Sequence, residues 1–261
     1  MRVSLIITTY NRPEVLSLIF KSIEDQTICP DEIIIADDGS GNSTKECVED
    51  FQRNSSISII HSWQEDRGFR VAKSRNKAIA KSNYEYIILI DGDVILHEKF
   101  IENHLKHAET NFFVQGQRVL VSESITKKII NNQYKNLFLF SRGLKNRKNA
   151  IYSAFLSKIF LTRKNVLNGI KTCNLAFYKS DCINVNGFNN EIEGWGREDS
   201  EFVARLFNNN VCRKNIHFNM IQFHLWHQDS SREVLQKNNI ILQKAIESKL
   251  NWCDNGINQY L

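Results

Sequence analysis

Proline is scarce in this sequence, and its cysteines are never closely paired. Only 2 prolines occur in 261 residues. The six cysteines form no Cys-x-x-Cys pair and no short spacing typical of a zinc site. They are Cys29, Cys47, Cys173, Cys182, Cys212 and Cys253. This distribution gives no indication of a zinc site and favours reduced thiols with mostly structural roles.

Long apolar runs are missing as well. No stretch of about 18 apolar residues occurs, and the first apolar run is too short for a signal peptide with a cleavage site. We therefore expect a cytoplasmic protein without a transmembrane helix. The composition, 42% hydrophobic and 24% charged, is that of a globular protein without disorder or repeats. The length suits a single α/β domain with insertions.

Acidic residues are absent from one long segment. Residues 124–180 contain 12 Lys and Arg and no Asp or Glu, interleaved with apolar clusters at 136–140 and 150–161. Such a segment can lie against an anionic membrane, where each nearby cation contributes about 1 kcal/mol. This interpretation predicts peripheral contact with the inner face of the plasma membrane. A solvated basic face over ordinary core helices is the alternative, since no clean amphipathic period runs through the segment.

The first half of the chain alternates between short apolar runs and helical stretches. The runs predicted as strands are 3–9, 32–38, 56–62, 84–93 and 111–121. The intervening helices are predicted at 13–26, 43–53 and 71–82, with another before the last strand. This pattern predicts an α/β fold with a mostly parallel sheet that is covered by helices on both faces.

The second half is less regular. It contains a short strand near 172–178, a turn with the sequence EGWGRED, a helix over 199–207, a strand near 219–226 and a terminal helix over 232–249. No linker separates the halves. We therefore expect one domain, with a nucleotide-binding half at 1–121 and an irregular, acceptor-binding half at 122–261.

Two carboxylates lie at the end of the fourth predicted strand. Asp91 and Asp93 are separated by one glycine, so both can turn toward the same point and supply oxygen ligands to Mg²⁺ or Mn²⁺. A solvated Asp-Gly turn is the alternative. Because ligands bind at the carboxyl ends of strands in open parallel sheets, the position favours the metal site.

Polar residues also end the first two predicted strands. Asp37 and Asp38 can accept hydrogen bonds from a nucleobase or a ribose, or they can simply cap the next helix. Within TTYNRP, Thr8, Tyr10 and Arg12 are available to line a base pocket and contact phosphate. These strand ends therefore predict a nucleotide site.

The stretch EDRGFRVAKSRNKAI at 65–79 places a glycine before a helix start, with Arg70, Lys73, Arg75 and Asn76 on the first turns. Exposed backbone N–H groups and cations of this kind suit a diphosphate. The sequence contains no Walker loop and no GxGxxG fingerprint after the first strand, which excludes those two nucleotide-binding motifs.

Together, TTYNR, DDGS, RGFRVAKSRNKAI, DGD and GWGRED resemble the family 2 glycosyltransferases of GT-A fold. The resemblance covers residues 2–230, and the C-terminal part is similar to galactosyl- and N-acetylgalactosaminyl-transferring members, including bacterial polysaccharide polymerase domains. It implies a Rossmann-like sheet, a UDP-sugar donor, a saccharide acceptor and Mn²⁺ or Mg²⁺. No nucleic-acid partner is expected.

The resemblance also implies roles for individual residues at the donor. Four would surround the uridine, with a fifth supporting them: Thr8, Tyr10, Arg12 and Asp38, supported by Asp37. Others would lie near the ribose, the phosphates or the sugar: Arg70, Arg75 and Asn76, with Lys171 and Asn174 as further candidates for the sugar.

For the metal, the resemblance implies direct ligation by Asp93, with Asp91 contacting the ribose or a metal-bound water. A histidine about two dozen residues after the catalytic carboxylate would complete the shell. That spacing points to His224, with His227 as the second choice. Either histidine can instead pack beside Trp226 in a structural role.

We expect Asp199 to be the general base and Glu198 to orient the acceptor or the donor sugar. Both carboxylates would also favour the positive end of the helix that follows, whatever their chemical role. Trp195 can offer a platform to a sugar, with Gly194 and Gly196 as joints of a closing segment, or it can anchor the turn as a core indole.

The resemblance, with these residues, implies an inverting transferase that moves a hexose or N-acetylhexosamine from a UDP-sugar to a saccharide hydroxyl. The acid-free segment favours a lipid-linked acceptor, as in the synthesis of bacterial O-antigen, capsule or lipooligosaccharide. A sugar nucleotidyltransferase would carry a Gly-rich basic loop after the first strand, and TTYNRP is not one. A silent glycan- or partner-binding module would have no chemical need for Asp91, Asp93, Asp199 and His224 together.

Overall fold

A computed structural model describes residues 1–131, 137, 139–228 and 231–261. Residues 132–136, 138 and 229–230 lie outside the described residues. The predicted apolar cluster at 136–140 and the end of FHLWHQD fall partly on them and are considered only at the remaining positions.

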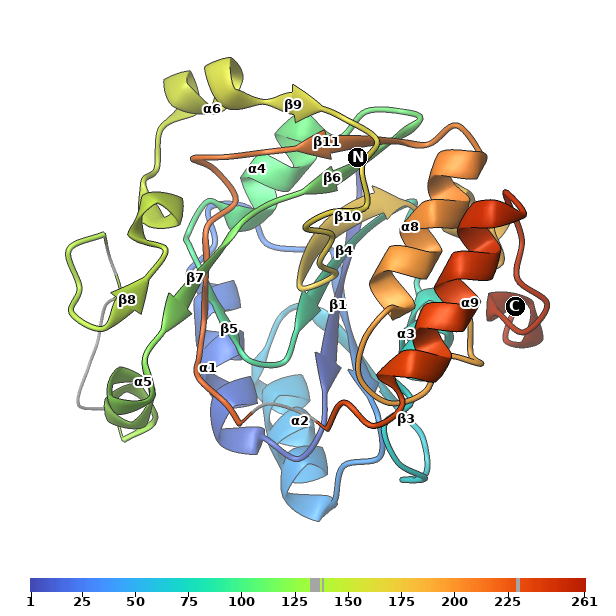
Figure 1. The fold of residues 1–261 in the computed structure, drawn as a ribbon. Helices are drawn as coiled ribbons and strands as arrows, with labels where there is room; N and C mark the ends of the chain where they lie inside the picture. The colour runs from blue at the N-terminus through green and yellow to red at the C-terminus, as the bar shows by residue number, and fades with distance from the viewer. Residues whose placement is uncertain (132–136, 138, 229–230) are drawn as a thin grey trace.

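An eight-stranded, mostly parallel sheet forms the centre of the molecule (Figure 1). In spatial order its strands are β3 (Ser58–Trp63), β2 (Glu32–Asp37), β1 (Val3–Thr9), β4 (Tyr86–Asp91), β10 (Asn174–Tyr178), β6 (Phe112–Gln115), β11 (Cys212–Asn215) and β9 (Thr162–Arg163). The first four are parallel to one another, and β10 runs antiparallel to both of its neighbours. The predicted fold class is confirmed.

Helices cover both faces of this sheet. The helices that pack on it are α1 (Pro13–Glu24), α2 (Asn42–Asn54) and α4 (Phe100–His107) on one face and α3 (Val71–Lys81), α7 (Lys179–Asn184) and α8 (Glu198–Asn208) on the other. The described residues also form α5 (Glu123–Ile130), α6 (Ala154–Phe160) and α9 (Leu235–Glu247). Short 3-10 turns occupy Arg147–Ala150 and Ile257–Gln259. Among the described residues, no helix combines the length and the apolar character needed to cross a membrane.

Buried side chains alternate between the two faces of the sheet. Leu5 and Ile7 of β1 pack in one apolar cluster with α1, α2 and α4, whereas Ile6 packs in a second cluster with α3, α7 and α8. Because both faces are covered, the central strands need apolar residues at every position, which produces the continuous apolar runs of the sequence.

The order of the strands reverses at β1. The chain moves from β1 outward to β2 and β3, then returns to place β4 on the other side of β1. The carboxyl ends of these parallel strands therefore meet at one edge, at the topological switch point where open α/β sheets bind ligands.

A second, four-stranded sheet lies beside that edge. Its order is β5 (Val94–Leu96), β12 (Gln222–His224), β7 (Arg118–Val121) and β8 (Leu144–Lys145). The prediction of one strand over 111–121 is thus wrong, because the chain leaves the main sheet after β6 and enters the second sheet as β7. At the crossing, the buried Asn174 amide donates to the carbonyl of Gln117 over 2.9 Å. A Cβ on Gly116 would lie 2.5 Å from the same amide, so only glycine fits there.

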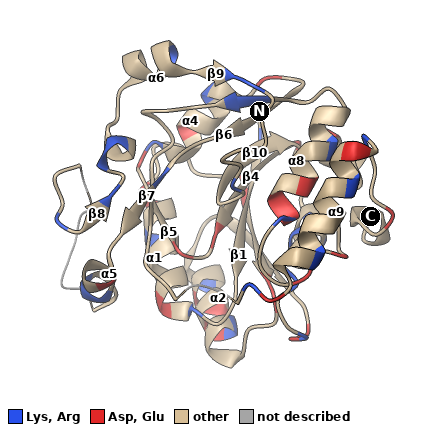
Figure 2. Ribbon diagram, viewed as in Figure 1, with Lys and Arg blue, Asp and Glu red and all other residues tan. Residues whose placement is uncertain are grey.

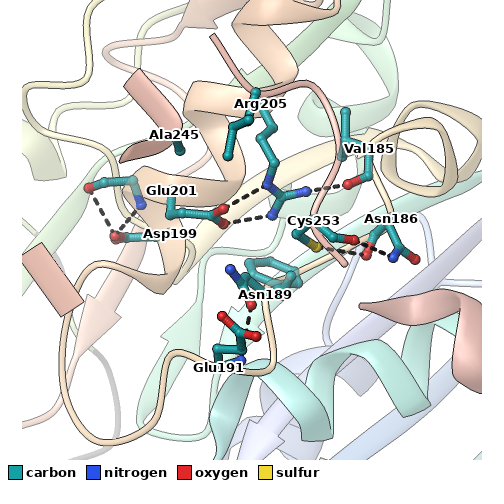
Figure 3. Close-up of polar contacts among 12 residues, drawn as sticks. Val185, Asn186, Asn189, Glu191, Asp199, Glu201, Arg205, Ala245 and Cys253 are labelled. Atoms are coloured by element: carbon teal, nitrogen blue, oxygen red, sulfur yellow. Dashed lines mark hydrogen bonds and ion pairs between the residues drawn. The ribbon is translucent and has the colours of Figure 1, made fainter. Parts of the chain in front are cut away.

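A buried ion pair fixes the inner side of α8 (Figure 3). Arg205 Nε and Nη2 donate to the two carboxylate oxygens of Glu201 over 2.8 and 2.7 Å. Arg205 Nη1 also donates to the carbonyl of Val185, after α7. Both charged side chains are almost completely buried, so this bidentate pair and the added carbonyl contact hold α8 against the segment that follows α7.

Candidate active site

The carboxyl-end edge of the main sheet opens into a cavity of about 1130 Å³, which the second sheet and the start of α8 also line. Most of the residues predicted for the site face it: Thr8, Tyr10, Arg12, Asp38, Arg75, Asp91, Asp93, Trp195, Gly196, Glu198, Asp199, His224 and His227. The candidate residues that do not line it are Asp37, Arg70, Lys73, Asn76, Asn174 and Gly194.

Asp93 and two histidines form a cluster in the cavity wall. Nε2 of His224 lies 3.4 Å from Oδ1 of Asp93, and Nε2 of His227 lies 3.1 Å from Oδ2. One ligand atom from each residue falls within 4.8 Å of the others, and Oδ1 of Asp93 is buried without a hydrogen-bond partner. A carboxylate and two imidazoles are a donor set that suits Mn²⁺ or a similar divalent ion. The residues present therefore fit the implied metal.

Strand pairing creates this cluster from distant parts of the sequence. In the β5–β12 ladder, Val94 is the register partner of His224, and the backbone N–H of Leu225 donates to the carbonyl of Asp93 over 2.8 Å. The pairing places FHLWH directly beside DGD, although about half of the chain separates them.

The electrostatics of the cluster follow from this packing. Burial alone would raise the pKa of Asp93, but the hydrogen bond from His227 and the positive charge of nearby groups outweigh it, and the pKa is lowered. The same hydrogen bond raises the pKa of His227, whereas burial lowers the pKa of His224. His224 therefore more readily stays neutral, the form in which an imidazole ligates metal.

Asp91 does not belong to this cluster of ligand atoms, and its expected contact with the ribose or a metal-bound water stays a prediction. Its Oδ1 accepts from Nη2 of Arg75 over 3.1 Å instead. Asp91 is the last residue of β4, and the turn at Gly92 separates its side chain from that of Asp93. Arg75 thus supplies the charge partner of Asp91.

Arg75 connects the two sides of the cavity. Besides Asp91, it donates through Nη1 to Oε1 of Glu198 over 3.3 Å and through Nε to the hydroxyl of Thr8 over 3.3 Å. Its guanidinium also lies over the ring of Phe188, 5.4 Å from the centroid. The carboxylates of Asp91 and Glu198 already pair with this guanidinium, so they compete with the predicted contact between Arg75 and phosphate.

Glu198 and Asp199 open α8 and face the cavity. Burial raises the pKa of Glu198 to about 7, and the adjacent Asp199 carboxylate adds to the shift while Arg75 opposes it. Burial likewise raises the pKa of Asp199, against the hydrogen bonds that its Oδ1 accepts from the backbone N–H and the hydroxyl of Ser200. These bonds orient the Asp199 carboxylate, and the raised pKa suits a proton acceptor.

The two adjacent aspartates after β2 have different environments. Asp37 is fully buried and accepts from the backbone N–H groups of Gly39 and Ser40 and from His61, so it shapes the loop. Asp38 lines the cavity and accepts from Gln64 and from the backbone N–H of Arg70, over 2.6 and 2.7 Å. Burial raises the pKa of Asp38 despite these bonds.

Arg70 and Asn76 do not lie where the sequence predicts them. The guanidinium of Arg70 donates to the carbonyl of Glu65, which turns it back onto its own loop. Asn76 is fully buried, and its amide donates to the carbonyl of Phe188 over 2.7 Å and to Asn190. On α3, therefore, Arg75 points into the cavity, whereas the next residue joins the helix to the segment after α7. Asn174, considered as a sugar contact, is likewise buried in the strand crossing.

The GWG turn borders the cavity through Trp195, which is exposed and has the guanidinium of Arg232 5.0 Å from its ring centroid. Gly194 and Gly196 have φ of +69° and +98°, values that favour glycine. A Cβ on Gly194 would lie 2.2 Å from Cγ2 of Val234. Close packing against the segment before α9 thus requires this glycine, whether or not the turn moves.

Sequence reasoning missed several cavity residues, among them Phe69 and Arg118. Phe69 is exposed beside Tyr10 and Asp38, where its ring can stack on a planar ligand. Arg118 lies at the start of β7 and also lines the cavity. An aromatic residue next to the glycine of RGFR could have signalled Phe69, but only the strand break at Gly116 brings Arg118 to the site.

Two family models match the chain. Residues 4–170 match the model described as glycosyl transferase family 2, which covers more than half of the sequence. Residues 157–226 match the model described as the N-terminal domain of galactosyltransferase.

Individual proteins are similar over most of the chain. Chondroitin synthase of Escherichia coli is 26% identical over 226 residues, covering 78% of this chain and 32% of that protein. Hyaluronan synthase of Pasteurella multocida is 26% identical over 231 residues, covering 78% of this chain and 22% of that protein. The chain thus spans about a third or less of the length of these relatives.

Solved structures show a similar fold. The structure of S. aureus TarS 1-349 in complex with UDP has a TM-score of 0.63 and 15% identity, covering 100% of this chain and 68% of that chain. The structure of the same protein in complex with UDP-GlcNAc has a TM-score of 0.57 and covers 88% of this chain and 60% of that chain.

Proposed function

The chain belongs to glycosyl transferase family 2, and from that premise we propose that it transfers a hexose or N-acetylhexosamine from a UDP-sugar to a saccharide hydroxyl, with inversion. One juxtaposition carries the proposal: a single cavity is lined by the Asp93–His224–His227 cluster and by the buried carboxylates of Glu198 and Asp199. The similarity to a structure in complex with UDP supports the choice of donor. Residues 1–121 would form the nucleotide-binding half and residues 122–261 the acceptor-binding half.

In the proposed reaction, the acceptor oxygen forms a bond to the anomeric carbon while the bond from that carbon to the diphosphate breaks. The electron pair of the broken bond leaves with UDP. Asp199 accepts the proton of the acceptor hydroxyl. Glu198, held by Arg75, orients the hydroxyl or the donor sugar through a hydrogen bond. A divalent ion held by Asp93, His224 and His227 would supply positive charge beside the departing diphosphate.

The nucleotide would lie at the ends of β1 and β2. Tyr10 and Phe69 offer exposed rings to stack on uracil, and Asp38 lines the same part of the cavity. Arg12 also lines the cavity and is near enough to Asp93 to help lower its pKa. This arrangement places a cation on the same side as the metal cluster, where the diphosphate charge would need it.

A panel of UDP-sugars with Mn²⁺, read out by thermal shift and by UDP release, tests the proposed function. We expect UDP with Mn²⁺ to raise the Tm, and EDTA to abolish the increase. Asp93→Asn should weaken Mn²⁺-dependent UDP binding by at least about tenfold, because the amide removes the ligand charge. Asp50→Asn, an exposed change on α2, is the matched control.

The same panel separates the alternatives. Failure of every UDP-sugar to bind, with or without Mn²⁺, would overturn the proposed function. Binding without UDP release for any acceptor would instead favour a silent binding module. Formation of a UDP-sugar from UTP and a sugar phosphate would favour a nucleotidyltransferase.

We further propose that the acceptor is lipid-linked and that a surface around α6 contacts an anionic membrane from the cytoplasmic side. The apolar side chains of Phe155, Ile159 and Phe160 are 70%, 58% and 51% exposed. They lie in the acid-free segment, whose cations cluster around α6, β9 and β8 (Figure 2). Lys145 and residues 167–173 of the same segment line the cavity, which connects this surface to the site. An acceptor carried by the membrane would reach the site from this side, in the synthesis of a bacterial surface polysaccharide.

Exchange of two apolar residues tests the membrane contact. Phe155→Ser with Ile159→Ser should lower cosedimentation with anionic phosphatidylglycerol vesicles by at least about tenfold, because burial of each side chain contributes about 1.5–3 kcal/mol. Ile240→Ser on α9, at a side chain 68% exposed on another side of the molecule, is the control (Figure 1). Added salt should weaken wild-type binding. Vesicle binding that is unaffected by added salt and by the double exchange would contradict the proposed membrane contact.

A further inference from the structure

Arg118 and Lys171 in the cavity wall have no carboxylate partner among the described residues. Arg118 and Lys171 are partly buried and line the cavity from β7 and from the loop before β10. Within the described ranges, neither has a carboxylate oxygen within 4.0 Å of its charged nitrogens. Arg75, in the same cavity, has two carboxylate partners. Desolvated cations without a counterion are costly, so the wall is organised to receive an anion from outside.

The loop that carries Lys171 is held in place by hydrogen bonds. Arg213 of β11 donates to the carbonyls of Val166, Asn168 and Gly169 over 3.1, 2.9 and 3.4 Å. The amide of Gln115 donates to the same Gly169 carbonyl over 2.8 Å. The cation is therefore presented from a fixed backbone, which lowers the entropy lost when an anion binds.

Contacts with β12 and with Asn149 fix the backbone of Arg118. It is the register partner of Gln222 in the β7–β12 pair, and its carbonyl accepts from Asn149 over 2.9 Å. Its Nη1 lies 4.0 Å from Sγ of Cys173, two residues after Lys171. The two cations therefore converge on one part of the wall.

Their electrostatic neighbours locate this part of the wall. Burial lowers the pKa of Lys171, the nearby Arg118 lowers it further, and Asp199 acts in the opposite sense. The two cations thus lie close to each other, with Lys171 near Asp199 and Arg118 also near His224. On the proposed function, that is between the departing diphosphate and the acceptor, where the transferred sugar would lie.

We propose that Arg118 and Lys171 form a subsite for an acidic group, a carboxylate or a phosphate, carried by one of the two reacting sugars. This inference rests on the proposed function and names the substrate class: at least one reacting sugar is acidic. A guanidinium can bind a carboxylate or phosphate through two parallel hydrogen bonds, and the ammonium adds a point charge. A neutral sugar would leave both cations unpaired, so the subsite would favour the acidic sugar.

The test compares ligands that differ only in the acidic group. In the donor arm, calorimetry with Mn²⁺ measures Kd for UDP, UDP-glucose and UDP-glucuronic acid. In the acceptor arm, it measures Kd at saturating UDP for oligosaccharides that end in glucuronic acid or in glucose. We expect the acidic ligand to bind about 10- to 100-fold tighter in one arm, which identifies the source of the anion.

The variants assign that preference to the two cations. Lys171→Met and Arg118→Gln should each reduce the preference to within about threefold while leaving the affinity for UDP unchanged. Lys171→Arg keeps the charge and should retain most of the preference. Lys164→Met removes an exposed cation of the same segment that does not line the cavity, and should change nothing. Unchanged Tm values would show that the variants fold.

Three results would overturn the inference. The first is no acidic preference in either arm. The second is a preference that persists in both Lys171→Met and Arg118→Gln. The third is an equal loss of affinity for UDP, UDP-glucose and UDP-glucuronic acid, which would assign the cations to the diphosphate. Each leaves UDP binding detectable, so the proposed function would survive. Absence of UDP binding in the wild type would overturn both.

Discussion

Asp199→Asn is expected to reduce turnover by about 10²- to 10⁴-fold or more while leaving the affinity for UDP nearly unchanged. The amide keeps the size of the side chain and can still accept a hydrogen bond from Ser200, but it cannot take a proton at neutral pH. Single-turnover UDP release and calorimetry with UDP and Mn²⁺ measure the two quantities separately. A change confined to turnover is the signature of a group that acts in the transition state.

The pH profile gives a second readout of the same residue. Because burial raises the pKa of Asp199, kcat/KM should fall with decreasing pH at values above the ordinary range of an aspartate. Below that pKa the carboxyl group is protonated and cannot act as a base. Asp254→Asn, at an exposed position, is the control. Wild-type turnover in Asp199→Asn, or a parallel loss of UDP affinity, would exclude Asp199 as the base.

Glu201→Gln is expected to lower the free energy of unfolding by about 3–5 kcal/mol, because it leaves Arg205 buried without its charge partner. Urea denaturation followed by circular dichroism measures the loss. The effect would fall on α8, whose first residues are Glu198 and Asp199, so activity should decline together with stability. Combining Glu201→Leu with Arg205→Met should recover part of the loss, since an apolar pair removes the unpaired charge.

An exposed pair provides the matched control for this exchange. Lys45 and Glu49 also stand four residues apart on a helix, but their side chains are 62% and 45% exposed. Glu49→Gln should therefore change the free energy of unfolding by less than about 0.5 kcal/mol. If Glu201→Gln cost no more than this control, the buried pair would not hold α8 in place.

The family and the GT-A fold could be predicted from the sequence, and both are confirmed. The central strands were predictable because β1, β2 and β4 are buried on both faces and therefore read as continuous apolar runs. The ligand-binding edge of the sheet was predictable too, because the carboxyl ends of the parallel strands β1, β2 and β4 lie at the same edge.

What could not be predicted depends on pairing between distant segments. The choice between His224 and His227 was open because spacing alone does not reveal the β5–β12 register, and the structure brings both to Asp93. The partners of Arg75 were hidden for the same reason, because a helix pattern does not show which carboxylates it meets. The break of the predicted strand 111–121 depends on the Asn174 amide, which comes from another strand.

The contacts of Arg75 and the β5–β12 pairing restrict which segments of this enzyme can be exchanged with those of a relative. Arg75 comes from the first half of the chain and Glu198 from the second, and the Asp93–His224–His227 cluster takes Asp93 from one and both histidines from the other. A chimaera that joined residues 1–121 to the second half of a relative would have to reproduce both connections at once. Donor and acceptor preferences should therefore be exchanged by altering individual side chains of the cavity wall rather than by swapping halves.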